Sequence, residues 1–173
     1  MPTHETPACP NCGTDHPGVL TADVCPVCGT VLPQERSMRL RPTTILWIDD
    51  DRLLLSVCGE AFERRGYRVL AVSDGPAGIL LAVREQPDLI LLDVMMVGMN
   101  GLEVCERLRA EPTLAETPIV LLTVLEDAGV RDRGRAVGAT ALWPKAYGPD
   151  DLLAKVTQLL GRAPRSAAPD AGL

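Results

Sequence analysis

Residues 87–93 read Pro-Asp-Leu-Ile-Leu-Leu-Asp, an apolar run between two aspartates. A strand with one face in water alternates apolar and polar residues, whereas a parallel strand covered on both faces is apolar throughout. The run has the length of a strand, and Pro87 stops the helix expected before it. We therefore predict a strand over residues 88–92 that is buried on both faces and closed by Asp93.

Short apolar runs and amphipathic segments alternate on either side of this strand. Further strands are predicted over residues 45–48, 67–72, 118–124 and 140–143, and helices over residues 53–62, 75–86, 102–110, 127–137 and 149–160. In the first helix, the buried stripe is expected to hold Leu54, Val57, Cys58 and Ala61. Five strand–helix units predict an α/β fold, with a parallel sheet covered by helices on both faces.

Composition divides the chain into four parts. Its 173 residues are enough for one ordinary domain and a small extra module. Residues 1–33 hold four of the six cysteines, residues 34–42 are interpreted as a linker, and residues 163–173 as a disordered tail. The α/β domain is therefore expected over residues 43–162. The other two cysteines, Cys58 and Cys105, lie among apolar residues and are expected in its core.

Charge and hydropathy exclude several classes of partner. The net charge of −6 argues against contact with nucleic acid, which needs clustered positive charge. The segment Arg36–Arg41 is the one that could touch an acidic partner, and we interpret it as part of a solvated linker. No apolar run is long enough to span a bilayer, and residues 1–10 lack the apolar core of a secretory signal. We therefore expect a cytoplasmic protein that does not contact a membrane.

Reactive side chains follow four of the predicted strands. Asp49 and Asp50 follow the first strand, Asp93 the third, Thr123 ends the fourth and Lys145 follows the fifth. Because the carboxyl ends of parallel strands meet at one edge of the sheet, we expect these side chains to lie together. Neighbouring carboxylates repel one another unless a cation lies among them, and oxygen ligands suit Mg²⁺. With a lysine and a hydroxyl beside them, they predict a site for phosphoryl transfer.

Each of these residues has a simpler interpretation when it is taken alone. An aspartate after a strand is often a helix cap, and the triplet Asp49–Asp51 fits the start of a capped helix. Thr123 is a residue type that favours strands, and a lysine such as Lys145 usually lies on the surface. Agreement among separate strand ends favours a shared site over these alternatives.

Five segments of the α/β domain resemble the response-regulator receiver family in order and spacing. They are residues 45–51 (ILWIDDD), 87–96 (PDLILLDVMM), 98–101 (GMNG), 117–123 (TPIVLLT), and Gly138-Ala139 before Lys145. The resemblance implies a flavodoxin-like sheet with the strand order 2-1-3-4-5.

The resemblance also implies a role for each site residue. Asp93 would accept a phosphoryl group from a histidine kinase or a phosphotransfer protein, and Thr123 and Lys145 would bind that group. Mg²⁺ would be bound directly by Asp50, with Asp93 and the backbone carbonyl of Met95 as further ligands and with Asp49 helping through water.

Three positions depart from the family pattern. Val97 and Ala146 stand where the family usually has proline, and Leu142 stands where it usually has a switching tyrosine or phenylalanine. Trp143 is adjacent to Leu142, but successive strand residues point to opposite faces. We therefore expect the chemistry of the site to be kept and its readout to be altered.

Two near-identical knuckles occupy the N-terminal part: Cys9-Pro10-Asn11-Cys12-Gly13 and Cys25-Pro26-Val27-Cys28-Gly29. Each turn points two sulfurs inward, and a segment with so small a core needs a metal to fold. The spacing predicts Zn²⁺ on Cys9, Cys12, Cys25 and Cys28, and it resembles a zinc ribbon over residues 8–31. Reduced cysteines without metal, or a rubredoxin-like iron site, are the alternatives. The lack of aromatic residues over residues 1–33 favours zinc over iron.

The leading hypothesis for function is an atypical response regulator that takes phosphate on Asp93 and signals by contact with a downstream protein. A receiver fold used as a phosphorylation-independent adaptor is the second hypothesis. A zinc- or redox-sensing module is the third, and it rests only on the cysteines. We do not expect an enzyme, because no second base and no substrate pocket are evident in the sequence.

Overall fold

The computed structural model of the chain describes residues 27–28, 42–124 and 128–161. The chain divides into two units, Met1–Arg41 and Pro42–Leu173, and the helices and strands described below belong to the second. Of the four predicted zinc ligands, only Cys28 is among the described residues. Cys9, Cys12 and Cys25 lie outside them, as do residues 34–41 of the linker and the tail over residues 163–173. The zinc module, the linker and the tail therefore stay predictions.

Five parallel strands form one sheet in the order β2-β1-β3-β4-β5. The strands are β1 Thr44–Ile48, β2 Arg68–Val72, β3 Leu89–Asp93, β4 Ile119–Thr123 and β5 Ala141–Pro144. Every residue of β1, β3 and β4 is buried, as their unbroken apolar sequences predict. Pairing of Ile48 with Leu92 puts the ends of β1 and β3 side by side.

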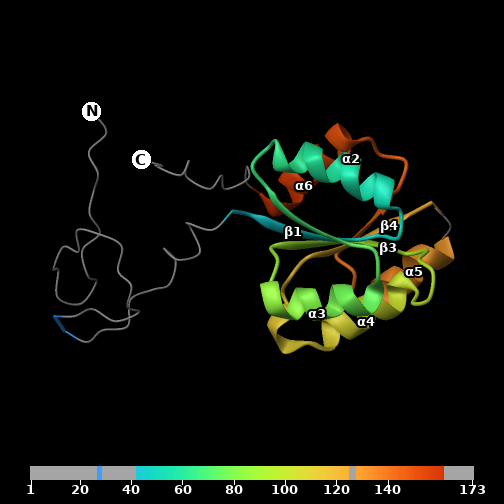
Figure 1. The fold of residues 1–173 in the computed structure, drawn as a ribbon. Coiled ribbons are helices and arrows are strands. Elements are labelled where there is room, and N and C mark those ends of the chain that lie inside the picture. The colour runs from blue at the N-terminus through green and yellow to red at the C-terminus, as the bar shows by residue number, and fades with distance from the viewer. Residues whose placement is uncertain (1–26, 29–41, 125–127, 162–173) are drawn as a thin grey trace. The chain divides into compact units, whose positions relative to one another are not determined.

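Helices cover both faces of this sheet. They are α2 Arg52–Glu63, α3 Gly75–Glu85, α4 Gly101–Ala110, α5 Ala128–Ala136 and α6 Pro149–Leu160, with a 3-10 turn, η1, at Pro112–Leu114. In Figure 1, α2 and α6 lie on one face, and α3, α4 and α5 lie on the other. This is the flavodoxin-like α/β fold that the sequence predicts. In the described ranges, no helix is long and apolar enough to cross a membrane.

Two apolar cores lie on the two faces of the sheet. In β1, Ile45 and Trp47 point into the core under α2 and α6. Leu46 and Ile48 point into the core under α3 and α4. This alternation, with period two, makes the sheet the shared wall of both cores and holds its carboxyl edge in place.

Element boundaries agree with the prediction to within one or two residues, and the predicted buried stripe of α2 is correct in part. Cys58 is buried, and Leu54 and Ala61 are partly buried against the core. Val57 is 51% exposed, however, and Leu55 and Phe62 are buried positions that the prediction lacked. Three consecutive leucines begin this helix, so the apolar pattern alone does not fix which of them points inward. The prediction for Cys58 and Cys105 is confirmed, since both thiols are buried.

Candidate functional site

The sheet hydrogen bonds continue past the ends of the strands and fix the residues that follow them. The N–H of Asp49 donates to the carbonyl of Val72 (3.0 Å), which extends the pairing of β1 with β2. The N–H of Lys145 donates to the carbonyl of Thr123 (2.8 Å), which extends the pairing of β5 with β4. The backbone at Asp49 and at Lys145 is therefore held by the sheet.

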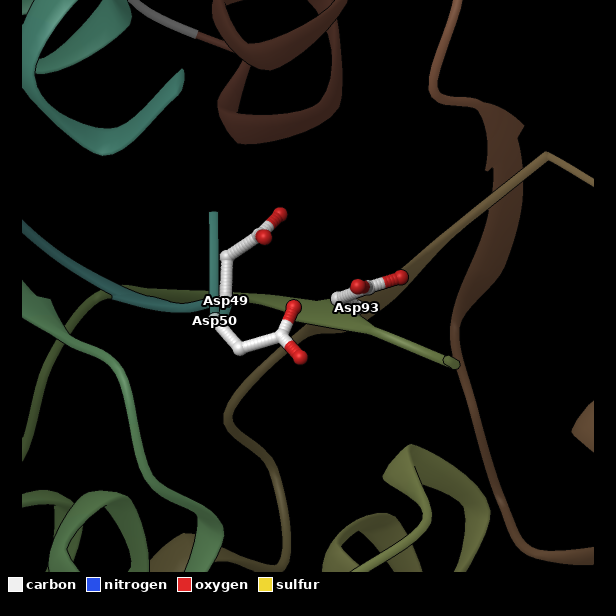
Figure 2. Close-up of side chains that lie close together, drawn as sticks. All are labelled: Asp49, Asp50 and Asp93. Carbon is white, nitrogen blue, oxygen red and sulfur yellow. The ribbon is translucent and has the colours of Figure 1, made fainter. Parts of the chain in front are cut away.

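Three carboxylates meet at this edge. Asp49, Asp50 and Asp93 each offer one oxygen, and these oxygens lie within 4.8 Å of one another. Figure 2 shows the three side chains gathered where β1 and β3 end. Asp49 and Asp93 are buried, and Asp50 is the most accessible of the three. The predicted acidic cluster is therefore present in the structure.

Lys145 is the positive charge of this cluster. Its Nζ donates to Asp93 Oδ2 (2.7 Å) and to Asp49 Oδ1 (3.0 Å). Burial by itself lowers the pKa of a lysine, but the hydrogen bonds to Asp93 and then to Asp49 outweigh burial, so the pKa of Lys145 is raised. The ammonium is thus held in its charged form against both buried acids.

The carboxylate of Asp49 is buried with one of its two oxygens unpaired. Burial raises the pKa of Asp49 above its usual value, against the hydrogen bonds from the Asp51 N–H and from Lys145. Its Oδ1 accepts from both of these donors, whereas its Oδ2 is buried without a hydrogen-bond partner. A buried carboxylate oxygen that has no donor fits a cation as its missing partner.

The charge balance of the cluster also fits a divalent cation. Three ionised carboxylates and one ammonium leave two negative charges. One Mg²⁺ ion would neutralise them, and carboxylate oxygens are the ligands that it prefers. The residues present therefore suit Mg²⁺ on both charge and chemistry.

The loop after β3 binds the carboxylates through its backbone. The N–H of Met95 donates to Asp93 Oδ1 (3.1 Å), and the N–H of Val97 donates to Asp50 Oδ2 (3.1 Å). A proline in place of Val97 would lack this donor. The predicted use of the Met95 carbonyl as a metal ligand stays a prediction.

Gly101 closes that loop against Asp93. Its N–H donates to the carbonyl of Val94 (3.0 Å), and a Cβ at this position would overlap the carbonyl oxygen of Asp93. The sequence places Gly101 at the end of a turn but gives no sign of this contact. The Asn100-Gly101 pair at the start of an amphipathic segment is the only signal that could have suggested it.

The helix-cap interpretation is correct for one member of the aspartate triplet. Asp51 accepts hydrogen bonds from the N–H groups of Leu53 and Leu54, each at 3.0 Å, and so caps α2. Asp93 is not a helix cap, because the next helix, α4, is capped by Asn100. Thr123 is fully buried where β4 ends, and its predicted contact with a phosphoryl group stays a prediction.

Known proteins share this domain. The sequence model of the response regulator receiver domain matches residues 45–157, which is more than half of the chain. The chain belongs to this family. Response regulator MprA of Mycobacterium sp. (strain KMS) is 36% identical over 129 residues, which cover 75% of this chain and 55% of that protein. The chain thus spans about half the length of such curated relatives.

Solved receiver structures agree with the fold. The chemotaxis protein CheY4 of Vibrio cholerae gives a TM-score of 0.65 at 28% identity, over 67% of this chain and 97% of that one. The receiver domain of the sensor histidine kinase PA1611 of Pseudomonas aeruginosa gives 0.63 at 25% identity, over 69% and 98%. That structure has a magnesium ion coordinated in its active site cleft.

Of the three departures from the receiver pattern, Leu142 lies within β5. Leu142 packs in the core on the α3–α5 face, whereas Trp143 packs in the core under α2 and α6, as the strand alternation predicts. Leu142 also lines a pocket of about 330 Å³ between α5 and β5, with Arg131 and Gly134. This pocket does not include the carboxylates. The Lys145–Ala146 peptide is trans, and Lys145 still reaches both acids.

Proposed function

We propose that this receiver domain accepts a phosphoryl group on Asp93 from the phosphohistidine of a histidine kinase or phosphotransfer protein. The observation that carries the proposal is the 2.7 Å contact of Lys145 Nζ with Asp93 inside a cluster of three carboxylates. A surface lysine and an isolated acid would not be held in this arrangement. Membership of the receiver family agrees with this role.

In the proposed transfer, a carboxylate oxygen of Asp93 attacks the phosphorus atom. The phosphorus–nitrogen bond of the phosphohistidine breaks, and the imidazole leaves with the electron pair and takes up a proton. Asp93 becomes an acyl phosphate. Lys145 would pair with the phosphoryl oxygens, and the Thr123 hydroxyl would donate to one of them, because this chemistry is mainly positioning and charge stabilisation.

Mg²⁺ is the proposed cofactor. Asp49, Asp50, Asp93 and the Met95 carbonyl would hold it, and it would neutralise charge on the phosphoryl oxygens. The unpartnered Oδ2 of Asp49 supports this assignment within the chain itself. The magnesium ion in the PA1611 receiver domain supports it from a protein with the same fold.

We also propose that the signal leaves the domain by protein contact, in an atypical way. Leu142 has no aromatic ring, so the coupled motion of threonine and aromatic residue that the family pattern implies is not expected here. The cysteine knuckles would then supply a Zn²⁺-bound contact module or a redox-sensing one. We expect a cytoplasmic protein without enzymatic activity of its own and without a nucleic acid partner.

The test is phosphorylation of the full chain by a small phosphodonor such as acetyl phosphate. Wild type should give a retarded band on a phosphate-affinity gel with Mg²⁺ and none with a chelator, and Asp93→Ala should give none in either. An absence of phosphate on wild type would overturn the proposal, as would equal labelling of Asp93→Ala. If wild type and Asp93→Ala, both treated with the phosphodonor, captured the same amount of a partner protein, the phosphorylation-independent adaptor would be favoured.

A further inference from the structure

Lys155 of α6 lies over two aromatic rings. Its Nζ is 4.8 Å from the ring centroid of Tyr147 and 5.6 Å from that of Trp143. All three side chains are half-buried. In the described part of the chain, no carboxylate lies within ion-pair distance of Lys155. The two rings are therefore the groups that hold this charge, by cation–π attraction.

The two rings flank the turn that carries Lys145. The turn runs from Pro144 to Tyr147 and is closed by the Tyr147 N–H, which donates to the Pro144 carbonyl (3.4 Å). Trp143 comes directly before this turn in β5. Lys155 thus draws together the residues on the two sides of Lys145.

Besides Lys155, the core under α2 and α6 also restrains this turn, because Trp143 and Tyr147 pack against it. The Lys145 N–H is tied to the Thr123 carbonyl in β4. Ala146 follows Lys145 and is exposed. It has no ring to fix the backbone, as a proline at this position would. Contacts from outside the turn must then set its shape, and Tyr147 over Lys155 is such a contact.

The chain has two lysines, and both belong to this arrangement. Of the 17 Lys and Arg residues, only Lys145 and Lys155 are lysines. A lysine ammonium and an arginine guanidinium are both attracted to aromatic faces, so the positive charge at position 155 is what the two rings require.

We propose that Lys155 is a positioning residue for the acid site. By binding the rings of Trp143 and Tyr147, it closes the turn between them and holds the Lys145 ammonium against Asp93 and Asp49. It does this without touching the reacting atoms. The inference rests on the proposed function for its consequence in phosphoryl transfer, but the placement of Lys145 can be tested without it.

The test follows acylation of Lys145 by a lysine-selective reagent, with mass spectrometry of the full chain. With only two lysines, modification at position 145 is read without overlap. Lys145 should react slowly in wild type, where it is ion-paired and 15% exposed. In Lys155→Met it should react about three- to thirtyfold faster, because a cation–π contact of ordinary strength is lost. Lys155→Arg, which keeps the charge, should stay closer to wild type.

Two further variants keep this test decisive. Tyr147→Leu removes one ring, keeps Lys155, and should give an intermediate rate even if Lys155→Met folds poorly. Arg64→Met removes an exposed positive charge just after α2 and should leave the rate unchanged. Unchanged acylation of Lys145 in folded Lys155→Met and in Tyr147→Leu would overturn the inference, whether or not Asp93 accepts phosphate.

Phosphorylation rates then separate positioning from general stability. Lys155→Met should slow the phosphorylation of Asp93. In a protein that already carries Lys145→Met, it should cause no further slowing, because Lys155 acts by placing Lys145. An equal slowing in both backgrounds would contradict this route. Absence of Asp93 labelling in wild type would refute the proposed function and leave the acylation result to decide the positioning role.

Discussion

Substitution of Lys145 by methionine should destabilise the receiver domain when no metal is present. The lysine bonds Asp93 at 2.7 Å and Asp49 at 3.0 Å, and the side chains of these acids are 2% and 0% exposed. Removal of one partner of a buried ion pair costs about 3–5 kcal/mol. Lys145 is itself 15% exposed, and burial already favours protonation of Asp49, so part of the repulsion can be relieved. We therefore expect a loss of about 3 kcal/mol, a large share of the roughly 5–15 kcal/mol that holds a domain folded.

Urea unfolding followed by circular dichroism measures this loss, first with a chelator and then with saturating Mg²⁺. A metal that binds only the native state stabilises it in proportion to its affinity. Because the lysine and the metal neutralise the same carboxylates, Mg²⁺ should bind Lys145→Met more tightly than it binds wild type. The Mg²⁺-dependent gain in stability should accordingly be larger in the variant.

Arg64→Met is the matched control, because it removes one positive charge from an exposed position just after α2. It should change stability by less than about 0.5 kcal/mol. A similarly small change for Lys145→Met in chelator would refute the view that this lysine is the counter-charge of the cluster. If Mg²⁺ raised the free energy of unfolding equally in wild type and in Lys145→Met, the view that Lys145 and the metal share the same carboxylates would be refuted.

Three further predictions use the same unfolding assay. Gly101→Ala should lower the free energy of unfolding by about 2–3 kcal/mol, because its Cβ would overlap the Asp93 carbonyl. Gly59→Ala, which has room in the interior of α2, should raise it by about 0.5–1 kcal/mol. Equal effects of the two substitutions would contradict the close approach of Gly101 to Asp93. Asp51→Ala should cost about 1 kcal/mol through the lost helix cap and leave phosphorylation intact, so that a loss of labelling would argue against a purely capping role. Burial raises the pKa of the Cys105 thiol from 9.0 to about 11, so the folded state keeps a proton that the unfolded state loses. Stability should therefore fall between about pH 9 and pH 11, by about 2–3 kcal/mol more than in Cys105→Ala, and parallel pH curves would refute this.

The strands could be predicted because the sheet is covered on both faces. Residues 89–92 and 119–122 are apolar without a break, and burial of β3 and β4 explains why. Strand order was not contained in this pattern, since the same five runs would suit other orders. It came from the resemblance to receiver domains. The inward face of α2 could not be read from the consecutive leucines at residues 53–55.

The residues of the site were predicted, but several of their contacts were not. The sequence put Asp49, Asp50 and Asp51 in one triplet, and only hydrogen-bond geometry shows that Asp51 caps α2. The approach of Gly101 to Asp93 and the rings around Lys155 depend on how α4 and α6 pack back against the strands that precede them. Local sequence patterns carry no information on such contacts.

Chemical identification of the phosphorylated residue tests the central claim most directly. Borohydride reduces an aspartyl phosphate to homoserine, which peptide mass spectrometry locates at a single position. After treatment with a small phosphodonor and Mg²⁺, we expect homoserine at position 93 of the full chain, and none when the metal is chelated. Homoserine at another aspartate, or none at position 93, would contradict the assignment of Asp93 as the phosphoryl acceptor.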